Sequence, residues 1–423
     1  MFQFLFTKTP LVFLVQSFWR DEAFSYLMAK KSLLDIMIST AHDFSPPFYY
    51  FVLHFWISIF GKSEIALRSL SLIFYWATLY VAFLFLNNVF KMTLKKSFLY
   101  LLLFVINPLL VYYAFEVRMY SMFAFFSILS FYALYKKNST LYLVSSILGV
   151  YTHYFMLLVV LGQYIFFRYK QKLVLLSFIP WMIFVLFNRS LGVQPFWISK
   201  FKLSHVITFV GNLYSGYDYG FKIVDTIMTP LSILLWIIII FAYLKRSKNR
   251  SSQQKLFKFI AVWGLVLPFF VVVVSYLKPI FLPRYLIFAV SGLILLLIFS
   301  FERMSKFYKI FLLGLLVIMS LSFLKVEILV RRKADFRKPI REIKNLMKKD
   351  DVLLVTSELD YFTAQYYLDE DRVFIYGKNY DEIQNYIGKV LIKKEAVVNN
   401  LPVYPKRAFV LNEWGGYDVQ ALY

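Results

Sequence analysis

Long apolar runs, separated by short clusters of cations, constrain the fold of this chain more than any other feature of its sequence. A helix that crosses the hydrocarbon core of a bilayer needs about 20 mainly apolar residues. Of the 423 residues, 60% are hydrophobic and 17% are charged, whereas a soluble domain is about 45–50% apolar and about 25% charged. The sequence therefore predicts a polytopic α-helical membrane protein and excludes a disordered chain. The absence of cysteine excludes disulfides and thiolate metal sites.

We expect about eleven crossings, with the shorter ones tilted or packed against neighbouring helices. The stretch 139–168 has cations at both ends and is too short for two full crossings. It is either a tight pair of short helices that turns near His153, which keeps both cation clusters inside, or a single crossing. An odd total places the N-terminus in the cytoplasm and the C-terminus outside. The expected crossings lie near 2–19, 66–90, 97–114, 118–135, 139–152, 154–168, 173–188, 228–244, 258–276, 284–301 and 309–325.

The formal net charge of +23 reflects topology rather than a nucleic-acid surface, because cytoplasmic loops of membrane proteins carry an excess of Lys and Arg. Only nine of the 24 acids lie in the first 324 residues. If the cation clusters are cytoplasmic, Glu302 alone among these nine lies inside, and the other acids face outward. This placement predicts an outward-facing active site. The clusters are Lys91/Lys95/Lys96, Lys136/Lys137, Arg168/Lys170/Lys172, Lys245 through Lys258, and Arg303/Lys306/Lys309.

Two outer loops and a C-terminal domain complete the expected organisation. The first outer loop covers 20–65 and contains Pro47–Gly61, a segment whose length suits an interfacial or re-entrant helix. The second covers 189–227. The composition then changes, which predicts a transmembrane domain over 1–325 and a small extracytoplasmic α/β domain over 326–423. In that domain the expected strands are Val352–Thr356, Val373–Tyr376 and Ala408–Asn412, and the expected helices are 358–368 and 381–388.

Acids beside the expected outer membrane face are the first candidates for chemistry. Asp21 and Glu22 follow the first expected crossing, and carboxylates there must face protein, water or a cation. Glu116 and Tyr120 share one face of a helix, whereas Arg118 can join them only if the helix is broken there. Each motif also has a structural interpretation. Asp21 and Glu22 can form a solvated turn or a helix cap, and Glu116 with Arg118 can mark a helix end.

Two further motifs place polar groups in apolar surroundings. His153, in Tyr151-Thr152-His153-Tyr154, lies within an apolar run, where a lone histidine is more often a packing residue than a ligand. Arg284, in Pro283-Arg284-Tyr285, starts an expected crossing with Lys278 nearby. A guanidinium at head-group depth can grip a lipid phosphate, although it can also simply extend to the interface.

The order and context of these motifs resemble those of the bacterial GT-C glycosyltransferases of the family 39 type, relatives of protein O-mannosyltransferases and of the lipid A aminoarabinose transferase. The resemblance covers most of the chain. It departs at Ser45-Pro46, where such enzymes commonly have His-Pro, with His42 close by. The matching pieces are WRDEAFS (19–25), HDFSPPFYYFVLHFWISIFGKSEIALRSLS (42–71), NPLLVYYAFEVRMYS (107–121), YTHYF (151–155), PRYLIFA (283–289) and DFRKPIREI (335–343).

The resemblance implies a GT-C catalytic domain in the plasma membrane and a hexosyl or pentosyl donor carried on a polyprenyl phosphate. The acceptor is expected to be a lipid, a glycan or a protein. In such enzymes an acid of the first outer loop acts as the base, and a second acid lies in the second outer loop. The matching residues are Asp21 as the base, Glu22 in support of it, and Glu116 as the second acid.

The chemistry of such a transfer assigns roles to the remaining residues. Because the leaving group is already a phosphate, one carboxylate takes the acceptor proton and cations stabilise the developing phosphate charge. A single displacement at C1 would invert the anomeric centre. We expect Arg118, Arg284 and Lys278 to bind the donor phosphate. The expected substrate-binding residues are His153, Tyr120, Tyr285 and His42.

Three points stay open at this level. A divalent cation could bind Asp21, Glu22, Glu116 and His153, although no spacing requires one. The alternative function is a transporter or lipid flippase, which would favour internal repeats and ionisable groups at the midplane. A non-catalytic scaffold would leave Asp21 and Glu116 far apart, without a shared cavity.

Overall fold

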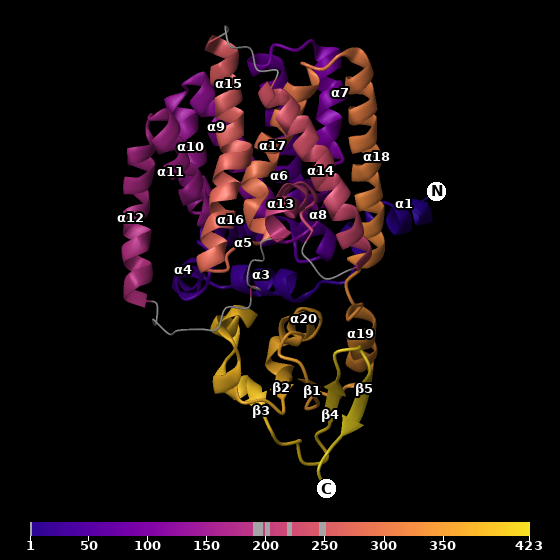
Figure 1. The fold of residues 1–423 in the computed structure, drawn as a ribbon. Helices are drawn as coiled ribbons and strands as arrows, with labels where there is room; N and C mark the ends of the chain where they lie inside the picture. Colours follow the sequence, from indigo (N-terminus) through magenta and orange to yellow (C-terminus); the bar gives the residue numbers. More distant parts are fainter. Residues whose placement is uncertain (1, 189–197, 199–203, 218–221, 245–250) are drawn as a thin grey trace.

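The protein is described by a computed structural model that covers residues 2–188, 198, 204–217, 222–244 and 251–423. Figure 1 shows a bundle of long helices with a small domain beyond one of its ends. Two short helices, α3 (Arg20–Lys30) and α4 (Leu33–Ala41), lie between the bundle and this domain. The arrangement confirms the predicted fold class, a polytopic helical membrane protein with a small C-terminal α/β domain.

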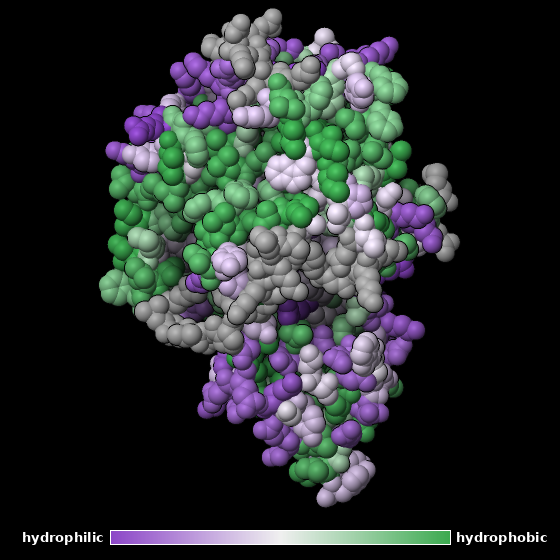
Figure 2. Space-filling view, in the orientation of Figure 1, coloured by the Kyte–Doolittle hydropathy of each residue, from purple (hydrophilic) through white to green (hydrophobic). Residues whose placement is uncertain are grey.

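Five described helices are long and apolar enough to cross a membrane. A sixth crossing results if α7 (Leu94–Val105) and α8 (Pro108–Ala114), which meet at an angle of 70°, form one broken span. Figure 2 shows the apolar surface of the bundle as a green band. Full-length crossings are fewer among the described residues than the expected total, because several apolar helices are short. The five are Glu64–Val89, Gln171–Asn188, Gln253–Leu277, Pro283–Phe301 and Lys306–Val330.

The crossing expected at 2–19 is not formed. It is replaced by α1 (Phe2–Lys8) and α2 (Val12–Val15), separated by a break at Pro10, since proline interrupts helical hydrogen bonding. Helices of 7 and 4 residues are too short to span a bilayer. The carbonyl of Thr7 accepts a hydrogen bond from Arg332 at 3.2 Å, so α1 lies at the same end of the bundle as the C-terminal domain. The predicted cytoplasmic position of the N-terminus depended on an odd number of crossings that included this one. Without this crossing, the count no longer supports that prediction.

Short helices occupy the first expected outer loop. Besides α3 and α4 it contains α5 (Phe48–Phe60), whose 13 residues fall short of a crossing, as expected for an interfacial segment. The second expected loop, 189–227, lies partly outside the described residues. Its described helix α13 (Ser204–Ser215) packs against α14 (Lys222–Leu244) and α17 (Ile287–Phe301). This part therefore belongs to the bundle rather than to an exposed loop.

The stretch 139–168 forms the expected pair of short helices. These are α10 (Ser139–Val150) and α11 (Phe155–Phe167), and His153 lies in the turn between them. The other helices of the bundle are α6 (Glu64–Leu84) with the π-helical turn Phe85–Val89, α9 (Tyr120–Lys136), α12 (Gln171–Asn188), α14 (Lys222–Leu244), α15 (Ser251–Ala261) with the π-helical turn Val262–Val266, α16 (Leu267–Leu277), the 3-10 turn Pro283–Leu286, α17 (Ile287–Phe301) and α18 (Lys306–Val330).

Cations and one acid gather at the end of the bundle that is remote from the domain. Glu302 accepts hydrogen bonds from Lys96 at 3.1 Å and from Lys309 at 2.9 Å. Two of the predicted cation clusters therefore lie together, and Figure 2 shows hydrophilic residues at this end. This grouping agrees with the excess of cations expected on the cytoplasmic side.

The C-terminal domain is built on a five-stranded sheet with the order β3-β2-β1-β4-β5. Strands β1 to β4 are parallel, and β5 is antiparallel to β4. The three predicted strands are present, and helix α20 occupies the expected position 358–368. The expected helix 381–388 is wrong, because the chain there forms two separate 3-10 turns. The elements are α19 (Arg337–Leu346), β1 (Val352–Val355), α20 (Tyr361–Tyr367), β2 (Val373–Tyr376), the turns Tyr380–Glu382 and Asn385–Ile387, β3 (Val397–Val398), β4 (Ala408–Leu411) and β5 (Tyr417–Gln420).

Candidate active site between the bundle and the C-terminal domain

The first turn of α3 carries two adjacent acids that meet different surroundings. Successive residues of a helix point about 100° apart, so Asp21 and Glu22 cannot share a partner by local geometry alone. Asp21 lies next to Arg20 and Arg118, and its side chain is 20% exposed. Glu22 points at Arg68 on α6, and both of these side chains are fully buried.

Glu22 is held by two cations from distant parts of the chain. Arg68 donates from Nε to Oε1 at 2.8 Å and from Nη2 to Oε2 at 2.7 Å. Lys333, which follows α18, donates from Nζ to Oε2 at 2.8 Å. Burial alone raises the pKa of Glu22, but Arg68 and Lys333 lower it by more, so its pKa lies below the ordinary value. Glu22 is therefore an ionised acid whose oxygens are already engaged.

Glu116 joins the same network through Lys333. Its Oε1 lies 3.2 Å from Nζ of Lys333, and both side chains are buried. Glu116 belongs to the non-helical segment between α8 and α9, which meets the condition under which Glu116 and Arg118 can face one site. Arg118 pairs with Asp21, whereas Lys333 joins Glu116 to Glu22. The segment that carries Glu116 and Arg118 also contacts α3 directly, because the backbone N–H of Val117 donates to Oε1 of Glu22 at 3.2 Å. The two groups of ion pairs therefore lie side by side.

Asp21 lies among arginines. Nε of Arg20 donates to its Oδ1 at 3.1 Å, and Nη2 of Arg118 lies 3.9 Å from its Oδ2. Burial raises the pKa of Asp21, but the charges of Arg118, Arg20 and Arg284 outweigh burial and lower the pKa to about 2. Asp21 is therefore ionised at neutral pH. Of the three predicted acids, it has the most exposed side chain.

A cavity of about 580 Å³ opens beside these residues, between the bundle and the C-terminal domain. The indole nitrogen of Trp19, another lining residue, is buried without a hydrogen-bond partner among the described residues. Five cations line the cavity against one acid, Asp360, and a concave wall of this charge favours an anion. The cations are Arg20, Arg284, Arg331, Arg332 and Lys333.

The domain contributes to this cavity through the carboxyl end of β1. Leu359 and Asp360 follow that strand, and Thr363 lies on α20. Strand β1 pairs with β2 on one side and with β4 on the other, so the strand order reverses at this point. In open α/β sheets, ligands bind outside the carboxyl ends of the strands at such a reversal. The domain therefore presents its favoured ligand-binding edge to the bundle.

The aromatic residues predicted to bind substrate form one cluster. His153 stacks on Phe123 with ring centroids 4.6 Å apart, and its centroid lies 5.9 Å from that of Tyr120 and 5.5 Å from that of Tyr285. The guanidinium of Arg118 lies 5.8 Å from the ring centroid of Tyr120. The structure thus brings His153, Tyr120 and Tyr285 beside the Asp21–Arg118 pair.

Two predicted residues lie elsewhere. Lys278 is exposed directly after α16, and His42 is exposed at the end of α4. Neither lines the cavity, whose described lining includes Arg284 alone among the predicted site residues. No group of three potential metal ligands occurs within the described part of the chain. Glu22 and Glu116 instead have cations as partners, so these residues do not form a site suited to a divalent ion.

Sequence reasoning missed Arg68 and Lys333. Arg68 is the one cation within the Glu64–Leu84 helix, and an ionisable residue inside an apolar span is by default a functional candidate, so a signal was present. Lys333 offers no such signal, because it belongs to a run of basic residues at the domain boundary. Lys333 and Glu22 are 311 positions apart in the sequence, and only the fold brings them into direct contact.

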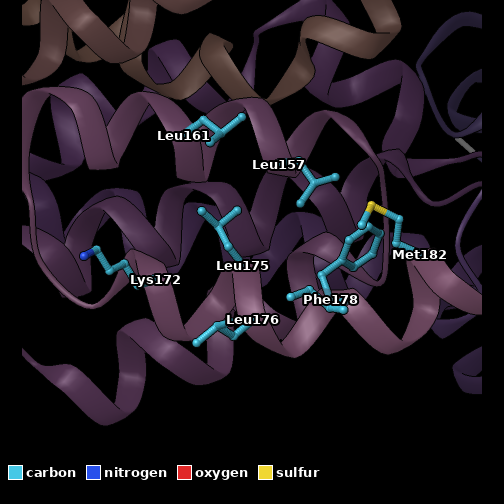
Figure 3. A pocket seen from close by; sticks show the side chains of 8 residues that line it. Leu157, Leu161, Lys172, Leu175, Leu176, Phe178 and Met182 are labelled. Atoms are coloured by element: carbon cyan, nitrogen blue, oxygen red, sulfur yellow. The ribbon is translucent and has the colours of Figure 1, made fainter.

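A second cavity, of about 480 Å³, lies between α11 and α12 (Figure 3). Figure 3 shows Leu157 and Leu161 near Leu175 and Phe178, with Lys172 as the labelled cation. The lining includes no acid and no second cation. The described lining of this groove therefore offers no carboxylate that could act as a base.

No family model matches the sequence, and no curated protein matches it. The fold does match solved structures. The crystal structure of ArnT from Cupriavidus metallidurans in the apo state aligns with a TM-score of 0.60 and 10% identity, over 95% of this chain and 90% of that chain. The structure of ArnT from Cupriavidus metallidurans bound to undecaprenyl phosphate aligns with a TM-score of 0.60 and 11% identity, over 97% and 93%. The chain therefore has the fold of ArnT over nearly its whole length, in agreement with the GT-C fold implied by the resemblance.

Proposed function

We propose that this protein is a membrane glycosyltransferase that moves a sugar from a polyprenyl-phosphate donor to an acceptor hydroxyl. The observation that carries the proposal is Asp21, an ionised and partly exposed carboxylate held among arginines beside a strongly basic cavity. The fold supports it, since ArnT has been solved with undecaprenyl phosphate bound. The location of the charges supports an enzyme over a transporter, because they gather at the end of the bundle rather than at its middle.

The cations of the cavity fit a phosphate leaving group. A polyprenyl chain has to stay in the membrane, so the donor phosphate would reach the bundle wall of the cavity first. Arg284 lines that wall, and its charge acts on Asp21. Arg118 contacts Asp21 directly. Guanidinium groups bind phosphate oxygens in a fixed, bidentate geometry, so these two arginines are the proposed donor clamp.

Asp21 is the proposed base because the other two acids are engaged elsewhere. Glu22 and Glu116 are buried and share Lys333. A carboxylate with a pKa of about 2 is a weak base on its own. A bound donor phosphate would offset the charges of Arg118 and Arg284 and thereby raise the pKa of Asp21. The base would thus gain strength only when the donor is in place.

The proposed reaction is a single displacement. The acceptor oxygen forms a bond to C1 of the sugar, and the bond from C1 to the phosphate oxygen breaks. The acceptor proton passes to Asp21, and the arginines stabilise the charge left on the polyprenyl phosphate. Attack from the face opposite the phosphate inverts the anomeric centre. The acceptor is a hydroxyl of a lipid, a glycan or a protein, and the sugar is a hexose or a pentose.

Substitution of Asp21 tests this proposal. Purified protein would be incubated with a panel of undecaprenyl-phosphate sugars, and transfer or hydrolysis would be followed by mass spectrometry. We expect Asp21→Asn to lose about 100-fold or more of the wild-type rate, in line with removal of a general base, while the protein stays folded. The matched control is Asp35→Asn, an exposed acid of the same outer region. Full activity of Asp21→Asn would exclude this residue as the base.

A further inference from the structure

The segment that joins the bundle to the C-terminal domain supplies a cation to the centre of the proposed site. This segment is residues 331–336, between the end of α18 and the start of α19. Lys333 leaves it and inserts its Nζ between two buried carboxylates, 2.8 Å from Glu22 and 3.2 Å from Glu116. Its side chain is only 6% exposed. Burial of a charged lysine is costly unless paired acids replace the hydrogen bonds that its ammonium group makes to water.

The charges in this network are balanced. Glu22 and Glu116 carry two negative charges, and Arg68 and Lys333 carry two positive charges. Two carboxylates that share a buried site cannot both stay ionised without a cation between them. Arg68 contacts Glu22, and Lys333 is the cation whose ion pair with Glu116 is observed. The bundle alone would therefore lack one of the charges that its own acids need.

The linking segment is itself held firmly in place. The backbone N–H of Lys333 donates to Gln16 at 3.2 Å. Arg331 donates to the carbonyl of Gly216 at 2.8 Å, and its guanidinium lies 4.4 Å from the ring centroid of Tyr112. These contacts fix the backbone from which Lys333 reaches the acids.

The domain also grips the residues directly before Asp21. The hydroxyl of Tyr367, on α20, accepts a hydrogen bond from the N–H of Phe18 at 2.8 Å and donates to Glu64 at 2.7 Å. Arg337, on α19, pairs with Glu64 at 2.9 Å and donates to the carbonyl of Val15 at 2.8 Å. The chain that leads into the catalytic turn of α3 is therefore held by both domain helices.

We propose that Lys333 is a positioning residue through which the C-terminal domain completes the active site: it holds Glu22 and Glu116 together, and thereby sets the arrangement of Asp21 and Arg118. The roles of Asp21 and Arg118 in this statement rest on the proposed function. Lys333 is not part of the proposed arginine clamp, because its Nζ is engaged by Glu22 and Glu116. Its effect passes through Glu22, the chain neighbour of Asp21, and through Glu116, which lies two residues from Arg118.

The test compares four variants of the full-length protein: Lys333→Met, Lys333→Arg, Glu116→Gln, and Glu116→Gln combined with Lys333→Met. Lys338→Met is the matched control, since Lys338 lies nearby on α19 and is exposed. Two measurements are made on each, the melting temperature in detergent and the pH dependence of transfer from undecaprenyl-phosphate sugars. The charged and titratable groups around Lys333 that bear on the pH profile are Arg20, Asp21, Glu22, Arg68, Tyr112, Glu116, Arg118, Arg284 and Arg331.

We expect Lys333→Met to lower the transfer rate by up to about 100-fold, as for a displaced catalytic group. It should also move the acidic limb of the pH profile to higher pH, because an uncompensated buried carboxylate raises the pKa of acids beside it. Lys333→Arg should keep the acidic limb at its wild-type pH. The double variant Glu116→Gln/Lys333→Met should also return the limb to that pH. Its melting temperature should be higher than the value obtained by adding the changes in melting temperature of the two single variants.

Two outcomes would overturn the inference. One is a folded Lys333→Met protein with the wild-type rate and pH profile, and the other is the same loss in Lys338→Met. If Lys333→Met does not fold, recovery of folded protein in the double variant supports the inference, and no recovery contradicts it. The melting temperatures need no substrate. A wild-type protein that transfers no sugar would therefore count against the proposed function alone. The coupling of Lys333 to Glu116 would still be measured by the melting temperatures of the single and double variants.

Discussion

At the scale of single residues, the three predicted acids turn out to have different tasks. Glu22 and Glu116 are buried against cations, whereas Asp21 keeps an exposed edge. Removing one partner of a buried ion pair typically destabilises a protein by about 3–5 kcal/mol, so Glu22 and Arg68 bear mainly on stability. Asp21 is the proposed base. Neighbouring positions in the motif WRDEAFS therefore contribute through different physical effects.

The pKa of Asp21 gives a prediction for pH dependence. The ordinary value of 3.8 falls to about 2 in the folded protein. The ionised form therefore stabilises the fold above pH 3.8, and this contribution disappears as the pH falls through about 2. Arg118→Gln removes a lowering charge and leaves burial in place, so the pKa of Asp21 should rise.

The measurement is the rate of sugar transfer as a function of pH. We expect the acidic limb of Arg118→Gln to lie at higher pH than that of the wild type, with a rate about 100-fold lower at neutral pH from loss of a phosphate donor contact. Arg341→Gln, an exposed position on α19, serves as the control. An acidic limb that does not move would show that Arg118 does not act on the base.

At the scale of elements, breaks in helices position the candidate residues. Asn107 caps α8 by accepting a hydrogen bond from the N–H of Leu110 at 3.0 Å, and Pro108 follows it. This cap and the proline end α7 and turn the chain by 70°. The next break, between α8 and α9, frees Glu116 and Arg118 from helical geometry. A continuous helix would have turned them to different faces.

Close helix packing at Gly292 supports the core of the bundle. Every residue of α17 is buried, and a Cβ added at Gly292 would lie 2.8 Å from the backbone nitrogen of Gly264. Small residues allow backbones to approach in this way. By contrast, a Cβ added at Gly314 on α18 would meet nothing within 4 Å.

These two glycines make a matched pair of substitutions. We expect Gly292→Ala to lower the free energy of unfolding by about 1–3 kcal/mol, because the helices must separate to admit the methyl group. Gly314→Ala should leave it unchanged or raise it by up to about 1 kcal/mol through helix propensity. Thermal unfolding in detergent measures both. Equal effects at the two sites would contradict the close approach seen at Gly264.

At the scale of the whole molecule, the C-terminal domain and the proposed site share one end of the bundle, and the Glu302 cluster occupies the other. This separation agrees with the distribution of charges expected across a membrane. The distribution of charges predicts that the domain is extracytoplasmic. In that orientation, a lipid-linked sugar in the outer leaflet can reach the proposed site.

Because the chain contains no cysteine, single introduced cysteines test this orientation cleanly. We expect Lys349→Cys, exposed in the domain, to react with a membrane-impermeant maleimide in intact cells or spheroplasts. Lys306→Cys, exposed at the other end of the bundle, should react only after permeabilisation. The reverse pattern would place the domain in the cytoplasm and would refute an outward-facing site.

Sequence patterns predicted the elements better than their lengths. Apolar runs located the helices of the bundle, and β-rich segments located β1, β2 and β4. The first expected crossing was wrong because Pro10 interrupts a run whose hydropathy alone indicates a span. Helix 381–388 was wrong because its chain forms short 3-10 turns. Hydropathy and periodicity are averages over a window of residues, so they do not detect a break at a single position.

The sequence by itself determined the class of the protein, the candidate acids, and Arg118 and Arg284 among the arginines around them, because apolar length and charge placement are properties of contiguous residues. Only the tertiary structure decided which of the three acids keeps an exposed edge. Arg68 and Lys333 occupy Glu22, and Lys333 also engages Glu116, which leaves Asp21 as the partly exposed acid of the three. That choice depends on burial and on contacts between residues hundreds of positions apart, and no local pattern encodes either.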